Sequence, residues 1–187
     1  MRNVLALVPA ICFLGVLTNA QADSALRMRN PKNGEQARIF VGHLGQIAPI
    51  AWRRANRFMR SWRKKAQRPM HPRLLRTLRH IQKHFRGKPI QLSSGYRVAD
   101  TPGRPSSYHS VGRAADIWID GVGKRRLFNF CRSLPNVGCG FYPRSRHVHV
   151  DIRGQSSVWV DLAGPGETPR YVDTPTRWLR RNRAAQN

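Results

Sequence analysis

The chain has 187 residues, of which 40% are hydrophobic, and its formal net charge at pH 7 is +25. This length is typical of one domain with a buried core and leaves little room for a second. With 34 Lys and Arg against 9 Asp and Glu, the composition indicates a polyanionic partner or an acidic surface to which the protein adheres.

The first 22 residues have the three parts of a secretory signal: basic Arg2, an apolar run over 4–17 and an Ala-x-Ala site over 20–22. We expect cleavage after Ala22, which removes Arg2 and lowers the charge from +25 to +24. The alternative is a membrane anchor, but the run is short for a bilayer span and no second hydrophobic stretch follows it. An exported basic protein can meet anionic cell-wall polymers, lipid headgroups or nucleic acid, or its charge can be a solvated surface without a partner.

Residues 23–50 mix Gly, Asn and Pro with short apolar stretches, and we expect an irregular lead-in there. Helical spacing of apolar residues from Trp52 to Trp62 predicts a helix over 51–65. A second helix is predicted over 71–87, opened by His71-Pro72 and ended by Gly87. Its apolar stripe, interpreted as core together with the tryptophans of the first helix, is Leu74, Leu75, Leu78, Ile81 and Phe85.

Short strands dominate the rest of the chain. They are predicted over 89–94, 114–119, 141–142, 147–152 and 158–160, with a helix over 121–134 between them. Gly and Pro predict a loop over 98–106, a turn region over 135–140 and a loosely ordered tail from 164, with one helical turn around 177–183.

Two of these strands carry polar residues that packing does not explain. Asp116 lies inside the apolar segment 114–119, where a buried carboxylate must be paired or bind a metal. On the strand 147–152, the side chains of His147, His149 and Asp151 share one face because alternate residues of a strand do so, and such a polar face is either solvent-exposed or part of a site. Together with His109, the residues Asp116 and His149 supply two imidazoles and a carboxylate. That is the ligand set of a mononuclear zinc site that leaves a position open for water, as a hydrolase requires.

Three blocks of sequence carry a family resemblance. They are Ser94-Gly95-Tyr96-Arg97, then Ser107-x-His109-x-x-Gly112-x-Ala114-x-Asp116, then Gly140-Phe-Tyr-Pro143-x-Ser145-x-x-Val148-His149-x-Asp151. Their order and spacing, over about residues 70–162, resemble the zinc D-Ala-D-Ala carboxypeptidase and murein endopeptidase family (peptidase family M15), and most closely its periplasmic murein endopeptidase branch. The resemblance implies an α+β fold with a small antiparallel sheet that carries the zinc ligands and helices packed on one side.

The resemblance also implies roles for residues of the site. One zinc ion would be held by His109, Asp116 and His149, and Arg97 would grip a carboxylate or carbonyl oxygen of a peptide, which suits its forked, permanently charged guanidinium. Tyr96 and Ser107 would line the substrate-binding site. Several relatives place a catalytic Glu three residues before the last ligand, where this chain has Arg146. The candidates for the general base are therefore His147 and then Asp151, which is alternatively a partner that orients a ligand histidine. The segment between Arg97 and His109 is also shorter than in many relatives, so substrate contacts of that loop cannot be transferred.

Cys131 and Cys139 are the two cysteines left after Cys12 departs with the signal. In an oxidising compartment such a pair favours a disulfide, and zinc ligation is the weaker alternative because no further sulfur ligand is available.

We therefore expect a basic lead-in and helix over 23–69, a zinc peptidase domain over 70–163 and a basic tail over 164–187. The predicted function is zinc-dependent hydrolysis of stem-peptide or cross-link bonds in peptidoglycan, of murein endopeptidase or D,D-carboxypeptidase type, in the periplasm or at the cell wall. The alternative is a catalytically silent, zinc-holding module that binds the wall. A nucleic-acid-binding role is disfavoured by the signal and the metal blocks.

Overall fold

The computed structural model describes residues 25–42, 45–99 and 107–182. The predicted signal over 1–22 and most of the predicted loop over 98–106 lie outside the described residues. Within the described ranges, none of the helices has the length and apolar character that crossing a bilayer requires.

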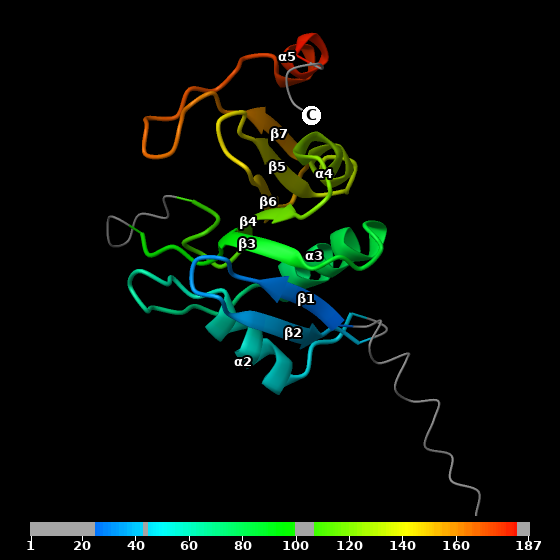
Figure 1. Ribbon diagram of the computed structural model, residues 1–187, viewed down its shortest axis with the longest axis vertical. Coiled ribbons are helices and arrows are strands. Elements are labelled where there is room, and N and C mark those ends of the chain that lie inside the picture. Colours follow the sequence, from blue (N-terminus) through cyan, green and yellow to red (C-terminus); the bar gives the residue numbers. More distant parts are fainter. Residues whose placement is uncertain (1–24, 43–44, 100–106, 183–187) are drawn as a thin grey trace, which may run out of the picture.

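One seven-stranded sheet organises the molecule, with strand order β2-β1-β3-β4-β6-β5-β7 (Figure 1). The strands β1–β3 and β5–β7 pair in parallel and the other neighbours are antiparallel. The α+β class is confirmed, but the sheet is larger than expected and mixed, and only its central antiparallel strands match the small sheet that was predicted. The strand bounds are β1 Ala25–Arg29, β2 Gln36–Phe40, β3 Ile90–Ser94, β4 Ala114–Ile119, β5 Val137–Phe141, β6 Val148–Ile152 and β7 Ser157–Val160.

The hairpin of β1 and β2 replaces the irregular lead-in that was expected over 23–50, so that prediction was wrong. Leu26 and Met28 are buried while Arg27 and Arg29 are exposed, which is the alternation of a half-buried strand. The turn between the strands closes at Gly34, whose φ of 72° lies in the left-handed region that favours glycine.

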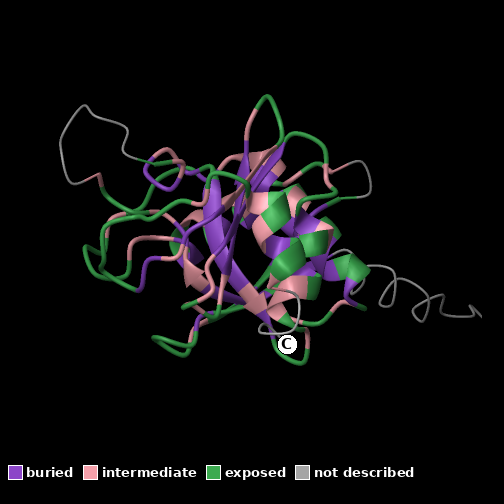
Figure 2. Cartoon of the chain, turned by 90° about the horizontal axis from the view of Figure 1, so that it is seen from above, coloured by how far each residue is buried: buried purple, intermediate pink, exposed green. Residues whose placement is uncertain are grey.

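Helices gather on one side of the buried sheet, as Figure 2 shows, and their bounds are α2 Pro49–Phe58, α3 Pro72–His84, α4 Lys124–Cys131 and α5 Pro175–Arg181. The helix predicted over 71–87 is confirmed as α3, and His71 caps it because its Nδ1 accepts the backbone N–H of Arg73 at 3.2 Å. The helix predicted over 121–134 is confirmed in part, since α4 is shorter at both ends.

The first predicted helix ends seven residues early. At its end the Met59 carbonyl accepts the backbone N–H of Tyr96 at 2.7 Å, a contact with a distant segment that draws the chain out of the helix. As a result Trp62 is 43% exposed, and its interpretation as a core residue was wrong.

The turn region predicted over 135–140 is instead β5, a fully buried strand. Its sequence Val-Gly-Cys-Gly-Phe resembles a turn because it is rich in glycine, but both glycines leave room for side chains that lie over the strand. A Cβ on Gly138 would collide with the Asp151 carboxylate, and a Cβ on Gly140 would lie 2.6 Å from the Trp159 ring.

The predicted disulfide between Cys131 and Cys139 is confirmed, and it ties the end of α4 to the middle of β5. The tail is more ordered than expected up to residue 182, because α5 buries Leu179 and its Trp178 ring lies 6.4 Å from that of Phe141.

A single hydrophobic core lies between the helices and the sheet. Alternate residues of β4 and β6 point into it, among them Ile117, Val148 and Val150. Since alternate residues of a strand point to opposite faces, Asp116 and His149 are directed to the other face of the sheet.

Candidate metal centre

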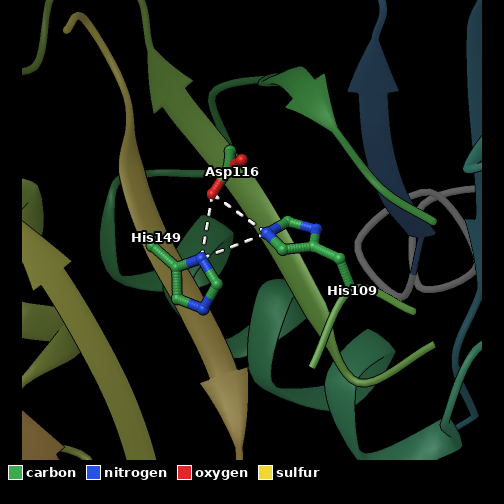
Figure 3. Close-up of side chains that lie close together, drawn as sticks. All are labelled: His109, Asp116 and His149. Atoms are coloured by element: carbon green, nitrogen blue, oxygen red, sulfur yellow. Dashed lines mark hydrogen bonds and ion pairs between the residues drawn. The ribbon is translucent and has the colours of Figure 1, made fainter. Parts of the chain in front are cut away.

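The three predicted ligands meet on that face. Asp116 of β4 and His149 of β6 are directly opposed in the antiparallel register. His109 comes from the turn just before β4, and its ring points toward the other two side chains (Figure 3). The sheet therefore fixes two ligands and a turn supplies the third.

The donor atoms converge closely enough to hold one cation. His149 Nδ1 lies 2.9 Å from Asp116 Oδ1 and 3.1 Å from His109 Nε2, and the last is 3.3 Å from the same carboxylate oxygen. All three residues are buried. A buried group of two imidazoles and one carboxylate, with its donor atoms turned toward a common point, has the chemistry of a transition-metal site.

Each histidine ring also forms a hydrogen bond through its outer nitrogen, the one that points away from the other two residues. The Nδ1–H of His109 donates to the Gly95 carbonyl at 2.6 Å, which leaves its Nε2 lone pair free. His149 hydrogen-bonds with Asp151 Oδ2 through its Nε2 at 3.1 Å, and its Nδ1, 2.9 Å from Asp116 Oδ1, is directed toward the other two residues. Outer hydrogen bonds of this kind orient ligand histidines in metal sites and raise their basicity.

The electrostatics of the group favour a cation at its centre. Burial would raise the pKa of Asp116, but the His109 and His149 rings outweigh burial and hold this pKa well below its usual range. Burial lowers the pKa of His109. The pKa of His149 is raised because the hydrogen bonds with Asp116 and Asp151 outweigh burial. The cluster thus keeps an ionised Asp116 carboxylate buried between His109, whose neutral form is favoured, and His149, whose charged form is favoured.

Asp151 is engaged by two neighbouring side chains, those of His149 and Arg153. It is fully buried, and the Arg153 Nε–H and Nη2–H donate to its two oxygens at 2.7 and 2.5 Å. Burial would raise its pKa, but the bonds from Arg153 and His149 outweigh that effect and lower it. Arg153 was not singled out from the sequence, although its place two residues after Asp151 puts it within reach of that carboxylate.

His147 lies at the mouth of the group. Its side chain is 22% exposed, and its Nε2 is 4.0 Å from Asp116 Oδ1. Its ring also contacts that of Tyr142, with a centroid distance of 5.1 Å. Burial lowers the pKa of His147, so a neutral ring is favoured at this position.

The predicted substrate residues differ in their proximity to the centre. The Arg97 Nη2–H donates to Asp116 Oδ2 at 3.3 Å, and 54% of the Arg97 side chain is exposed. Tyr96 lies beside it and lines a cavity that contains Asp116. Ser107 is exposed, and its carbonyl accepts the backbone N–H and the hydroxyl of Ser110, so its described contacts belong to the turn of His109.

Arg146 occupies the position of the expected glutamate but points elsewhere. Its Nη2–H donates to Asp120 Oδ1 at 2.7 Å, and its guanidinium lies 4.9 Å from the centre of the Trp118 ring. Its charge is therefore compensated outside the ligand group.

An aromatic wall beside the histidines was missed in the sequence. The Trp159 ring lies 5.1 Å from that of His149, and its Nε1–H donates to the Tyr142 hydroxyl at 3.2 Å. The signal that could have identified it is the pair Gly138 and Gly140 on β5, since glycines on one face of a strand indicate close approach of another group.

Comparisons with known proteins give one consistent answer. The family model described as "Peptidoglycan L,D-endopeptidase MepK" matches residues 18–159. Proteins of that name from Escherichia coli (strain K12) and Shigella flexneri are 33% identical to the chain over 146 residues, which cover 72% of this chain and 79% of each relative. A "Probable peptidoglycan L,D-endopeptidase MepK" from Haemophilus influenzae is 30% identical over 145 residues, or 72% and 77% of the two chains. No solved structure matches significantly. These names support an endopeptidase and give no support to the D,D-carboxypeptidase type.

Proposed function

Because this chain belongs to the peptidoglycan L,D-endopeptidase MepK family, we propose that it hydrolyses an L,D peptide bond in peptidoglycan cross-links. The observation that carries the proposal is the convergence of three buried donor atoms, from His109, Asp116 and His149, with a hydrogen bond at the outer nitrogen of each histidine ring.

The proposed cofactor is one zinc ion per chain, since two imidazoles and one carboxylate suit zinc and leave room for further ligands. When bound, such a cation polarises the scissile carbonyl and makes water nucleophilic at neutral pH. The protein's part is to fix the ligands, orient the substrate and move protons.

His147 is our candidate for the group that accepts the proton of the attacking water and returns it to the leaving amine. Its partial exposure and its position beside Asp116 support this role, and a neutral imidazole is the form that can accept a proton. Asp151 is assigned to orienting His149, because both of its oxygens are engaged by Arg153.

Arg97 is our candidate for anchoring the substrate. Its guanidinium reaches the metal group with one nitrogen while more than half of its side chain stays exposed, so other N–H groups can bind a carboxylate or carbonyl oxygen. Holding the peptide in register with the reacting groups is a large share of catalysis in a two-substrate reaction.

The proposed location is outside the cytoplasm, at the cell wall. The disulfide fits an oxidising compartment, and the charge of +25 fits an anionic polymer as the surface on which the enzyme works.

The test is digestion of purified sacculi with the mature protein, with and without chelator, and identification of the products by mass spectrometry. We expect metal-dependent release of monomers from L,D cross-links, and loss of this release in His149→Ala but not in His80→Ala, which replaces an exposed histidine of α3. Folding of both variants is checked by circular dichroism. Metal binding without any cleavage would contradict the proposal and favour a wall-binding module instead.

A further inference from the structure

Several basic side chains lie beside the candidate metal centre, around a cavity of about 240 Å³. Asp116 and Arg97 line the end of this cavity that is nearest the centre. The cavity extends to Lys32 in the turn after β1 and to Trp62 and Arg63 in the segment after α2. In Figure 1 these two segments lie at the same end of the sheet as the chain that follows β3. None of these three residues belongs to the blocks that carry the family resemblance.

These three residues contact one another and line one side of the cavity. We call them the basic wall: Lys32, Trp62 and Arg63. The Lys32 ammonium lies 5.7 Å from the centre of the Trp62 ring and the Arg63 guanidinium 5.2 Å from it. Both contacts have the geometry of cation–π pairs, which hold the cations against an exposed aromatic face. Lys32 also donates to the Ser93 carbonyl at 2.6 Å, so its ammonium is anchored at the cavity and keeps further N–H donors.

The cations of the basic wall differ from the other two cations of the cavity in their contacts with acidic side chains of the described residues. Of the four cations that line the cavity, Arg60 is neutralised by Glu35, at 2.6 and 2.9 Å, and Arg97 reaches Asp116. Within residues 25–42, 45–99 and 107–182, neither Lys32 nor Arg63 forms an ion pair. Burial lowers the pKa of Lys32, and the charges of Arg63 and Arg97 act in the same direction while that of Asp116 opposes them. An anion in the cavity would relieve this repulsion.

We propose that the basic wall binds a carboxylate of the peptidoglycan peptide remote from the scissile bond, with the adjoining peptide chain lying on Trp62. This inference rests on the proposed function and deepens it, because it makes the preferred substrate an acidic peptide with at least two free carboxylates. Arg97 anchors the group nearest the reacting bond, and Lys32 and Arg63 bind the second, so the peptide is held at two points along the cavity.

The test compares steady-state hydrolysis of a purified cross-linked muropeptide dimer with that of a panel in which each carboxylate is converted singly to the carboxamide. Wild type is compared with Lys32→Gln and Arg63→Gln. The matched controls are Lys64→Gln and Lys83→Gln, which remove the same charge at exposed positions that do not line the cavity.

For wild type, we expect amidation of one carboxylate to raise KM by about three- to tenfold with little change in kcat. Lys32→Gln and Arg63→Gln should raise KM for the free acid to a similar extent and lose sensitivity to that one amidation, while both controls behave as wild type. The proposal is overturned if no member of the panel separates the variants from wild type, or if the controls show the same rise in KM.

Failure of the proposed function gives a different result, namely no cleavage of any dimer by the metal-loaded wild type. In that case the binding role of the basic wall is tested by isothermal titration calorimetry, in which the same dimer and its amidated forms are titrated into the metal-loaded protein and their affinities are compared. A preference for the free acid that Lys32→Gln abolishes supports the wall, and equal affinities refute it.

Discussion

At the level of single residues, Asp151 shows how an outer contact orients His149, a proposed metal ligand. Its carboxylate accepts the Nε2–H of His149 and is itself fixed by Arg153. This chain of contacts, from guanidinium to carboxylate to imidazole, determines which ring nitrogen of His149 faces Asp116 and His109. Without a carboxylate at that point, either tautomer of His149 becomes available.

We predict that Asp151→Asn weakens metal binding by about 10- to 100-fold while the fold is retained. The neutral amide orients His149 poorly and leaves the charge of the half-buried Arg153 without its carboxylate partner. The measurement is zinc affinity by competition with a chromophoric chelator. Asp120→Asn removes an exposed carboxylate outside the ligand group and serves as the control. Equal affinities for the two variants would show that His149 is oriented in some other way.

His147→Gln is predicted to have the opposite profile. The variant should keep its metal and its affinity for substrate, while kcat falls by about 100- to 10,000-fold, because only proton transfer is removed. Metal content by elemental analysis and steady-state kinetics on a soluble dimer separate the two effects. A variant that retains most of its activity would assign the base to another group.

At the level of secondary-structure elements, β5 shows how a glycine-rich strand shapes the centre. Gly138 and Gly140 stand opposite Asp151 and His149 on the neighbouring strand β6. The missing side chains leave space in which the Asp151–Arg153 pair and the Trp159 ring lie over the sheet. The bare face of β5 is thus part of the architecture that supports the ligands.

Gly138→Ala is therefore predicted to lower both the stability and the metal affinity of the protein. The added methyl group collides with Asp151 and Arg153, and overpacking of this kind costs about 1–3 kcal/mol. Urea unfolding and zinc titration measure the two losses. Gly154→Ala, where the added atom meets nothing within 4 Å, should change neither. A Gly138→Ala protein that matched this control would mean that the buried pair can shift aside freely.

The same elements show what the sequence can and cannot reveal. Asp116 was identifiable because an acid within an apolar strand requires a partner, and α3 because its stripe and its Pro72 are local signals. The end of α2 was not identifiable, since it depends on a hydrogen bond between Met59 and Tyr96, which are far apart in the chain. For the same reason the basic wall escaped detection: Lys32 and Trp62 become neighbours only through tertiary folding.

At the level of the whole molecule, the dominant property is the excess of 34 basic over 9 acidic residues. Part of this charge lies on the exposed faces of α2 and α3, for example at Arg53, Arg54 and Lys83, on the helical side of the sheet. The metal group opens on the other face. Exposed basic residues also lie on that face, for example Arg27 and Arg29 of β1, so the positive charge is spread over both sides of the sheet.

Sacculus binding is predicted to fall by about tenfold or more when the ionic strength rises from ~0.1 M to ~1 M, because the Debye length shortens from about 10 Å to about 3 Å. Hydrolysis of a soluble dimer should respond less, since only the few charges of the cavity contribute. Co-sedimentation with sacculi and kinetics on the dimer, run over the same salt series, make the comparison. If sacculus binding and dimer hydrolysis had the same salt dependence, retention by basic residues outside the cavity would be contradicted.

The opposed placement of Asp116 and His149 has a consequence for how the chain matures. Side chains alternate along a strand, so slipping β6 by one residue against β4 would direct the two ligands to different faces. A metal ion held by these residues would bind the chains whose strands are correctly paired, and by mass action it would enrich that population. Metal uptake would then depend on correct assembly of the sheet. A metal-deficient fraction of a preparation would include mispaired chains as well as correctly folded chains that lack the ion.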